Sequence, residues 1–169
     1  MPEQQSVVAP LQTYVANFAE HQAAGAGVVL SGPAGVGKDH LLCAMGVNVA
    51  LYFGVSVSWT SGADLWASFR DAIGRDRSES YVLSPYQGAG VLVISDPVPP
   101  AGTLTEYQAG QLLRLVDWRY RYLRPTWVSL NVSGRKEADE RLGVAVADRL
   151  RDGALCLACN WPSYRRPAR

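Results

Sequence analysis

One glycine-rich segment constrains the fold of this chain more than any other feature. It fits the pattern G-x-x-x-x-G-K at 32–38, between an apolar run at 27–31 and a helix-forming run at 38–51. In such a turn, successive backbone N–H groups point inward around phosphate oxygens, while the helix start and the lysine ammonium add positive charge. A glycine turn with an incidental lysine is disfavoured by the flanking strand and helix. We therefore predict a nucleotide site formed by Gly32, Pro33, Ala34, Gly35, Val36, Gly37, Lys38, Asp39 and His40.

Apolar runs and helical patterns alternate along the rest of the chain. Strands are expected at 27–31, 55–60, 91–94, 126–131 and 154–158. Helices are expected at 10–24, 38–51, 61–73, 106–123 and 135–151, with residues 74–90 mostly loop. Strands that alternate with helices predict an α/β sandwich around a mostly parallel sheet.

Composition narrows the class of protein. The chain has 169 residues, of which 48% are hydrophobic and 18% charged, as expected of one soluble domain. No apolar run approaches the roughly 18 residues of a membrane span, and the N-terminal residues lack the pattern of a signal peptide. Three cysteines are too few for a disulfide framework, and Cys156 and Cys159 are interpreted as core residues. We expect a cytoplasmic protein with no membrane partner.

The two parts of the chain carry opposite charge. Residues 1–109 have a net charge of −5 and residues 110–169 of +6. Aromatic residues at 118, 120 and 122 alternate with basic ones, a composition suited to phosphate contact and base stacking. An amphipathic helix that buries its aromatics is the alternative. Possible DNA contacts are Arg119, Arg121 and Arg124.

Acidic residues near the loop predict a metal site. Asp39 stands where a Ser or Thr hydroxyl usually contacts Mg²⁺, and its carboxylate can hold the metal directly or else cap the helix. In ATPases with this loop, a neighbouring strand ends in an Asp that orders the metal. In strict register Ser95 takes that place and Asp96 takes the next one, where an acid polarises the attacking water; a one-residue bulge would bring Asp96 to the metal instead.

Five ordered stretches resemble the AAA+ ATPases of the DnaC-type helicase loaders and the IstB-type transposition helpers. GVGKDHLL at 35–42 is similar to their G-T-G-K-[NT]-H-L-[AL], and DWRY at 117–120 with RPT at 124–126 is similar to their R-Y helix and P-T strand. SLN at 129–131 resembles T-S-N, LG at 142–143 with DRL at 148–150 resembles L-G and [SD]-R-L, and WPSYR at 161–165 resembles W-x-S-[YF]-R. Together they span about residues 26–166.

The resemblance implies a fold and two further site residues. The fold would be an AAA+ P-loop NTPase core of the ASCE type, a three-layer sandwich with a five-stranded sheet and no separate lid domain. Residues 1–24 would form an N-terminal helical extension and residues 25–169 the core. Asn131 would be the sensor of the γ-phosphate or attacking water, and Arg149 an arginine finger for a neighbouring subunit. Alternatively, Asn131 closes a turn and Arg149 pairs with Asp148 or Asp152.

The implied function is ATP binding and hydrolysis with Mg²⁺ in helicase loading during DNA replication. Hydrolysis would be slow because Ser95 replaces the expected acid. The partners would be further copies of the chain with shared ATP sites, a replicative helicase or transposase, and single- or double-stranded DNA. The alternatives are an IstB-like transposition regulator, a P-loop kinase of small molecules or nucleotides, and an ATP-binding module that does not hydrolyse its ligand.

Overall fold

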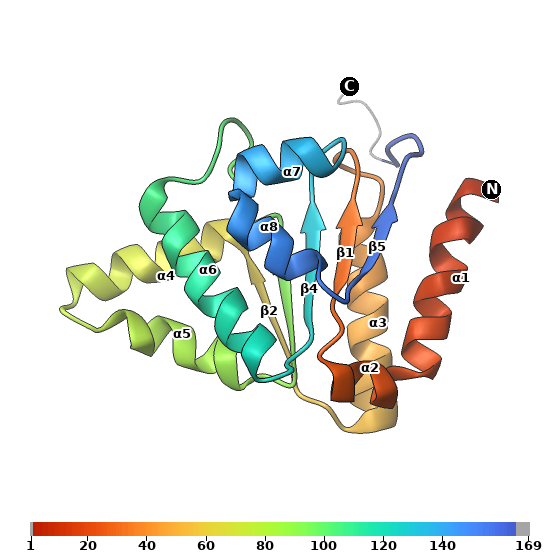
Figure 1. Ribbon diagram of the computed structural model, residues 1–169, viewed down its shortest axis with the longest axis horizontal. Helices are drawn as coiled ribbons and strands as arrows, with labels where there is room; N and C mark the ends of the chain where they lie inside the picture. The colour runs from red at the N-terminus through yellow and green to blue at the C-terminus, as the bar shows by residue number, and fades with distance from the viewer. Residues whose placement is uncertain (1, 165–169) are drawn as a thin grey trace.

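The computed structural model describes residues 2–164 and has one parallel five-stranded sheet at its centre (Figure 1). Arg165 of the last resembling stretch lies outside the described residues. The strand order is β2-β3-β4-β1-β5, and every neighbouring pair is parallel. The expected α/β sandwich is confirmed, with strands β1 (Val28–Ser31), β2 (Val57–Ser61), β3 (Val91–Ser95), β4 (Thr126–Leu130) and β5 (Leu155–Ala158).

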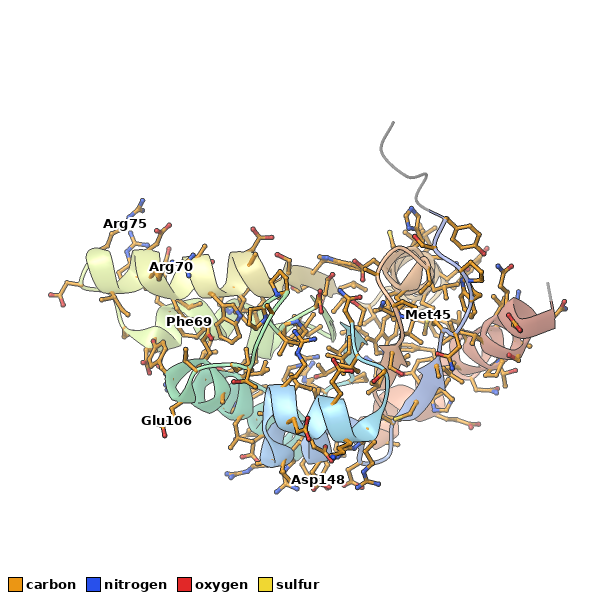
Figure 2. All side chains as sticks on the ribbon, turned by 90° about the horizontal axis from the view of Figure 1, so that it is seen from above. Met45, Phe69, Arg70, Arg75, Glu106 and Asp148 are labelled. Carbon is orange, nitrogen blue, oxygen red and sulfur yellow. The ribbon has the colours of Figure 1, made fainter. Side chains whose placement is uncertain are left out.

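Helices cover both faces of this sheet because alternate strand residues point to opposite sides. Val28, Val93 and Trp127 pack toward the first three helices, whereas Val29, Ile94 and Val128 pack toward the last five. Figure 2 shows Met45 on the first side and Phe69 on the second. The helices are α1 (Pro2–Ala16), α2 (Phe18–Ala24), α3 (Lys38–Phe53), α4 (Gly62–Gly74), α5 (Glu79–Gly88), α6 (Glu106–Arg121), α7 (Arg135–Leu142) and α8 (Val144–Arg151).

Three expected elements differ from the structure. The segment expected as loop at 74–90 contains α5, which includes Pro85 and buries Val82 and Leu83 against the core. The single helix expected at 135–151 is two helices, because Gly143 has a φ of 88° that breaks the helical path between α7 and α8. The first helix begins at residue 2 rather than 10, and its residues Val7, Leu11 and Tyr14 are buried together with α3.

Arg119 is fully buried, so the expectation that it contacts DNA is wrong. Its guanidinium instead joins the end of α5 to the start of β4. The guanidinium donates to the carbonyls of Tyr86 (2.7 Å), Gln87 (3.2 Å), Ala89 (2.9 Å) and Pro125 (2.7 Å), and to the hydroxyl of Thr126 (3.0 Å). Burial, together with the charge of Arg124, lowers the pKa of Arg119 to about 9, so the group remains protonated at neutral pH.

Replacing Arg119 by lysine should therefore destabilise the fold. A single ammonium cannot satisfy five acceptors on two segments, and buried acceptors without a donor cost about 1–3 kcal/mol each. We expect Arg119→Lys to lower the free energy of unfolding by about 2–4 kcal/mol in urea denaturation. Arg121→Lys is the matched control, because the Arg121 side chain is 72% exposed, and should change stability by no more than about 0.5 kcal/mol. Equal stabilities of the two variants would contradict this role of Arg119.

Candidate nucleotide-binding site

The glycine-rich loop follows the carboxyl end of β1 and leads into α3, as the sequence predicts. Gly32 opens the loop at a φ of 139°, and a Cβ atom there would lie 2.4 Å from the carbonyl oxygen of Cys159. Only glycine fits this approach. The loop borders a cleft of about 780 Å³, lined by Gln4, Val8, Ala34, Gly35, Val36, Gly37, Lys38, Asp39, His40, Leu41, Ser95, Asp96, Ser129, Asn131, Trp161 and Tyr164.

Lys38 and Asn131 meet inside this cleft. The Lys38 Nζ donates to the carbonyls of Gly32 and Pro33, both at 2.8 Å, and to the Asn131 Oδ1 at 2.7 Å. The ammonium is thus held by the loop that precedes it and by the residue that follows β4. A nucleotide phosphate at the loop would lie beside both side chains.

Asp96 lies on the other side of Asn131. The Asn131 Nδ2 donates to the Asp96 carboxylate, and its backbone N–H donates to the same carboxylate at 3.3 Å. Asp96 has a φ of 47°, which turns the chain sharply after β3. Gly62 permits this turn, since a Cβ atom there would lie 2.4 Å from the Asp96 carbonyl oxygen. Lys38, Asn131 and Asp96 therefore form one hydrogen-bonded row across three loops.

Asp39 contacts a different pair of side chains. The hydroxyl of Ser95 donates to its Oδ2 at 2.7 Å, and that of Ser129 to its Oδ1 at 2.6 Å. Strand β3 pairs without a bulge with β2 from Val91 to Ser95 and with β4 from Leu92 to Ser95. Ser95 therefore stands in strict register beside Asp39, and Asp96 is directed to Asn131.

Several residues at the site are given no role by the sequence patterns. Ser129 contacts Asp39, and Arg141 donates to the Asn131 carbonyl at 3.0 Å. Tyr164 binds the loop at Gly35 through a backbone hydrogen bond of 3.0 Å, and Gln4 bonds to the Tyr164 hydroxyl. These contacts join residues up to 160 positions apart, so a local pattern has no means of revealing them. Ser129 and Tyr164 lie in the SLN and WPSYR stretches that carry the family resemblance, but the resemblance assigns no role to either.

Arg149 lies away from this cleft. It lines a small pocket with Gly27 and Thr126, near the amino ends of β1 and β4, whereas the glycine-rich loop follows a carboxyl end. Its Nε pairs with Asp117 at 3.2 Å, and its guanidinium lies 4.8 Å from the ring centre of Tyr120. Within the described residues, the expected alternative partners, Asp148 and Asp152, form no ion pair with it.

Metal-ligand clusters of the zinc type are not found among residues 2–164, where no three His, Cys, Asp or Glu residues converge. Cys156 is exposed rather than in the core, and Cys159 is buried as expected. A Mg²⁺ ion held by one or two carboxylates, with phosphate and water oxygens completing its shell, needs no such cluster. Asp39, at the edge of the cleft, fits that donor set. No helix in the described part of the chain is long and apolar enough to span a bilayer.

These features together define the class of protein. A parallel sheet of order β2-β3-β4-β1-β5, a phosphate-binding loop after β1, and polar residues after β3 and β4 are those of the AAA+ P-loop fold. The solved DnaC helicase loader has the same fold, with a TM-score of 0.80, 23% identity, and coverage of 92% of this chain and 89% of that one. AMPPCP-bound DnaA from Aquifex aeolicus gives a TM-score of 0.70 at 16% identity, over 89% of this chain and 44% of that one.

The sequence itself identifies the family. The chain belongs to the family of IstB-like ATP binding proteins, whose model matches residues 4–169. Two replicative helicase loaders DnaC of Buchnera aphidicola are similar to it: that of the Acyrthosiphon pisum subspecies is 29% identical over 96% of this chain, and that of the Baizongia pistaciae subspecies is 30% identical over 95%. The matched region is 65% and 63% of the length of these relatives.

The site geometry predicts that replacing Lys38 by alanine abolishes ATP binding. We expect Lys38→Ala to abolish measurable ATP binding in a fluorescent-nucleotide titration, because the phosphates lose the ammonium. It should also lower the free energy of unfolding, by about 1–2 kcal/mol, because the Gly32 and Pro33 carbonyls lose their donor. Lys136→Ala, at the only other lysine, is the control, since that side chain is 91% exposed on α7. Unchanged ATP affinity in Lys38→Ala would refute the assignment of the loop.

Proposed function

We propose that this chain binds ATP together with Mg²⁺, hydrolyses it slowly, and uses the nucleotide to govern assembly on DNA in helicase loading. The observation that carries the chemistry is the row of Lys38, Asn131 and Asp96 in the cleft. The biological role is supported by the similarity to replicative helicase loaders over nearly the whole of this chain. Because the chain matches less than two thirds of those relatives, the role is proposed for this chain and not transferred from them.

The side chains of the row have complementary tasks in hydrolysis. The Lys38 ammonium contacts the β- and γ-phosphates, and the Asn131 amide orients the attacking water or the γ-phosphate. The Asp96 carboxylate accepts a proton from that water. Mg²⁺, when bound, neutralises charge on the phosphate oxygens. Residue 95 supplies a hydroxyl where related ATPases have an acid, which supports a slow reaction.

Arg149 supports a site shared between copies of the chain. It lies near the amino ends of the strands, so it serves the nucleotide of a neighbour and not that of its own loop. Its present partners do not hold it firmly: the Arg149 side chain is 39% exposed, and exposed ion pairs contribute about 0–1 kcal/mol. The Arg149 guanidinium can therefore leave Asp117 and contact a γ-phosphate at a subunit interface at little cost in free energy. In this arrangement residues 25–169 form the ATP-binding core and residues 1–24 an N-terminal extension, of which α1 packs against α3.

Because Arg119 is buried, the proposed DNA contact rests on the other two basic residues, which are exposed. Arg121 and Arg124 are exposed. The neighbouring Tyr122 is 62% exposed, and its ring is tilted by 33° against that of Trp118, with 4.3 Å between the ring centres. Charged and aromatic groups on one surface suit a nucleic acid strand. The alternative partner is a transposase, which the resemblance to the IstB-type transposition helpers implies.

Mixing two variants that are impaired in different ways tests the shared site. We expect Arg149→Ala to lower phosphate release at least tenfold with little change in ATP affinity, because an arginine finger acts mainly in the transition state. Equimolar Arg149→Ala and Lys38→Ala proteins should regain part of the activity, since one interface combines an intact loop with an intact arginine. Turnover per chain should also rise with protein concentration. Flat turnover together with an inactive mixture would exclude the intersubunit role.

Deposition of a helicase on DNA tests the biological role. We expect the chain, with ATP and Mg²⁺, to increase the amount of replicative helicase bound to single-stranded DNA in a bead assay. Arg121→Ala with Arg124→Ala should weaken DNA binding several-fold. Arg135→Ala is the matched control, since Arg135, like Arg121, is an exposed arginine beside an aspartate four residues away. Stimulation of a transposase without any effect on the helicase would favour the alternative.

A further inference from the structure

A carboxylate and a hydroxyl stand in exchanged positions at the metal side of the cleft. In P-loop ATPases, the Ser or Thr after the loop lysine holds Mg²⁺, and an Asp at the end of a neighbouring strand completes the site. Here the residue after Lys38 is Asp39, the strand residue is Ser95, and the two side chains are 2.7 Å apart. We infer that the two groups have traded places, so that Asp39 supplies the carboxylate for Mg²⁺ and Ser95 its hydroxyl partner. This inference rests on the ATP site proposed above.

The contacts of Asp39 fix its carboxylate in one orientation. Ser95 ends β3, Ser129 lies near the end of the adjacent β4, and each donates to a different carboxylate oxygen. Both hydroxyl groups are neutral, so they orient Asp39 without neutralising its charge. Each carboxylate oxygen also has a second lone pair, and carboxylate oxygens are ligands that Mg²⁺ accepts.

Asp96, the second carboxylate of the cleft, contacts Asn131 and not the serine hydroxyls that hold Asp39. Asp96 accepts from the side chain and the backbone of Asn131, and its φ of 47° carries the chain away from the β3 ladder. It therefore belongs to the row that handles the attacking water. After the exchange, residues 39 and 95 still provide one carboxylate and one hydroxyl, as in the usual arrangement. The negative charge, however, lies in the first turn of α3 and not at the end of β3.

The new place of the charge has a measurable consequence. Asp39 follows the phosphate-binding lysine directly, so its carboxylate repels the phosphates of ATP unless a divalent cation lies between them. ATP affinity should depend on Mg²⁺ more steeply in this chain than in a chain with a neutral residue at 39. Removing the charge should improve binding without Mg²⁺ and remove most of the gain that Mg²⁺ gives.

Titration of a fluorescent ATP analogue in Mg²⁺ and in EDTA tests the exchange. In the parent we expect affinity to fall about 100-fold in EDTA, and in Asp39→Asn by no more than about tenfold. The control is Asp64→Asn. Asp64 also lies in the first turn of a helix and accepts from a serine hydroxyl, at 2.6 Å from Ser61, but it does not line the cleft. Thermal unfolding of each variant without nucleotide verifies its fold.

Restoring the usual arrangement provides the second measurement. Asp39→Thr alone should lose most of the Mg²⁺ dependence, and Asp39→Thr combined with Ser95→Asp should regain it, because the carboxylate returns at the strand end. A parent that binds ATP while Asp39→Asn keeps its full Mg²⁺ dependence would overturn the exchange alone. A double variant that behaves like Asp39→Thr would also overturn it. A folded parent that binds no nucleotide would overturn the ATP site, and the inference with it.

Discussion

The position of β4 between β1 and β3 is the constraint on which the site depends. β1 carries the phosphate-binding loop and β3 ends beside Asp96, so the residue after β4 necessarily stands between them. That residue is Asn131, whose amide has an acceptor for Lys38 and a donor for Asp96. Neither a carboxylate nor an ammonium offers both. Strand β4 also places Ser129 opposite Ser95. This one strand therefore positions both the row of Lys38, Asn131 and Asp96 and the serine partners of Asp39.

Most of the fold follows from local patterns, and its exceptions have local causes. The glycine-rich loop with its strand and helix is recognisable because the backbone conformation at Gly32 and Gly37 requires glycine. Helix α5 is missed because its sequence is polar and contains Pro85, and it is held by two side chains, Val82 and Leu83, that reach a core built by other elements. The break at Gly143 is visible in the sequence, but a glycine within a helical pattern does not reveal which φ it adopts.

The site is only partly predictable, because side-chain partners come from distant segments. The loop, Asp39 and Asp96 are predicted from the sequence pattern, whereas Asn131 is implied only by the family resemblance. Asp39, Asp96, Asn131 and the loop from Ala34 onward line one cleft. The sequence leaves open whether Ser95 or Asp96 stands at the metal-ordering position, since that choice depends on whether the strand contains a bulge. For Arg119 the sequence prediction is wrong. An arginine among aromatic residues predicts an exposed DNA contact, but the Arg119 guanidinium is buried against carbonyl groups of residues 86–89. No spacing within α6 contains that information.

The hydrogen bond between Asp39 and Ser95 also bears on evolution within this class of ATPases. Under the exchange inferred above, an ancestor with a hydroxyl at 39 and a carboxylate at 95 needs two substitutions to reach the present pair. The intermediate between them has either two carboxylates or none. Selection would therefore act on the pair as a single character, and residues 39 and 95 should vary together among relatives. A motif search that scores each column separately would count two defects in a lineage that carries one coordinated rearrangement.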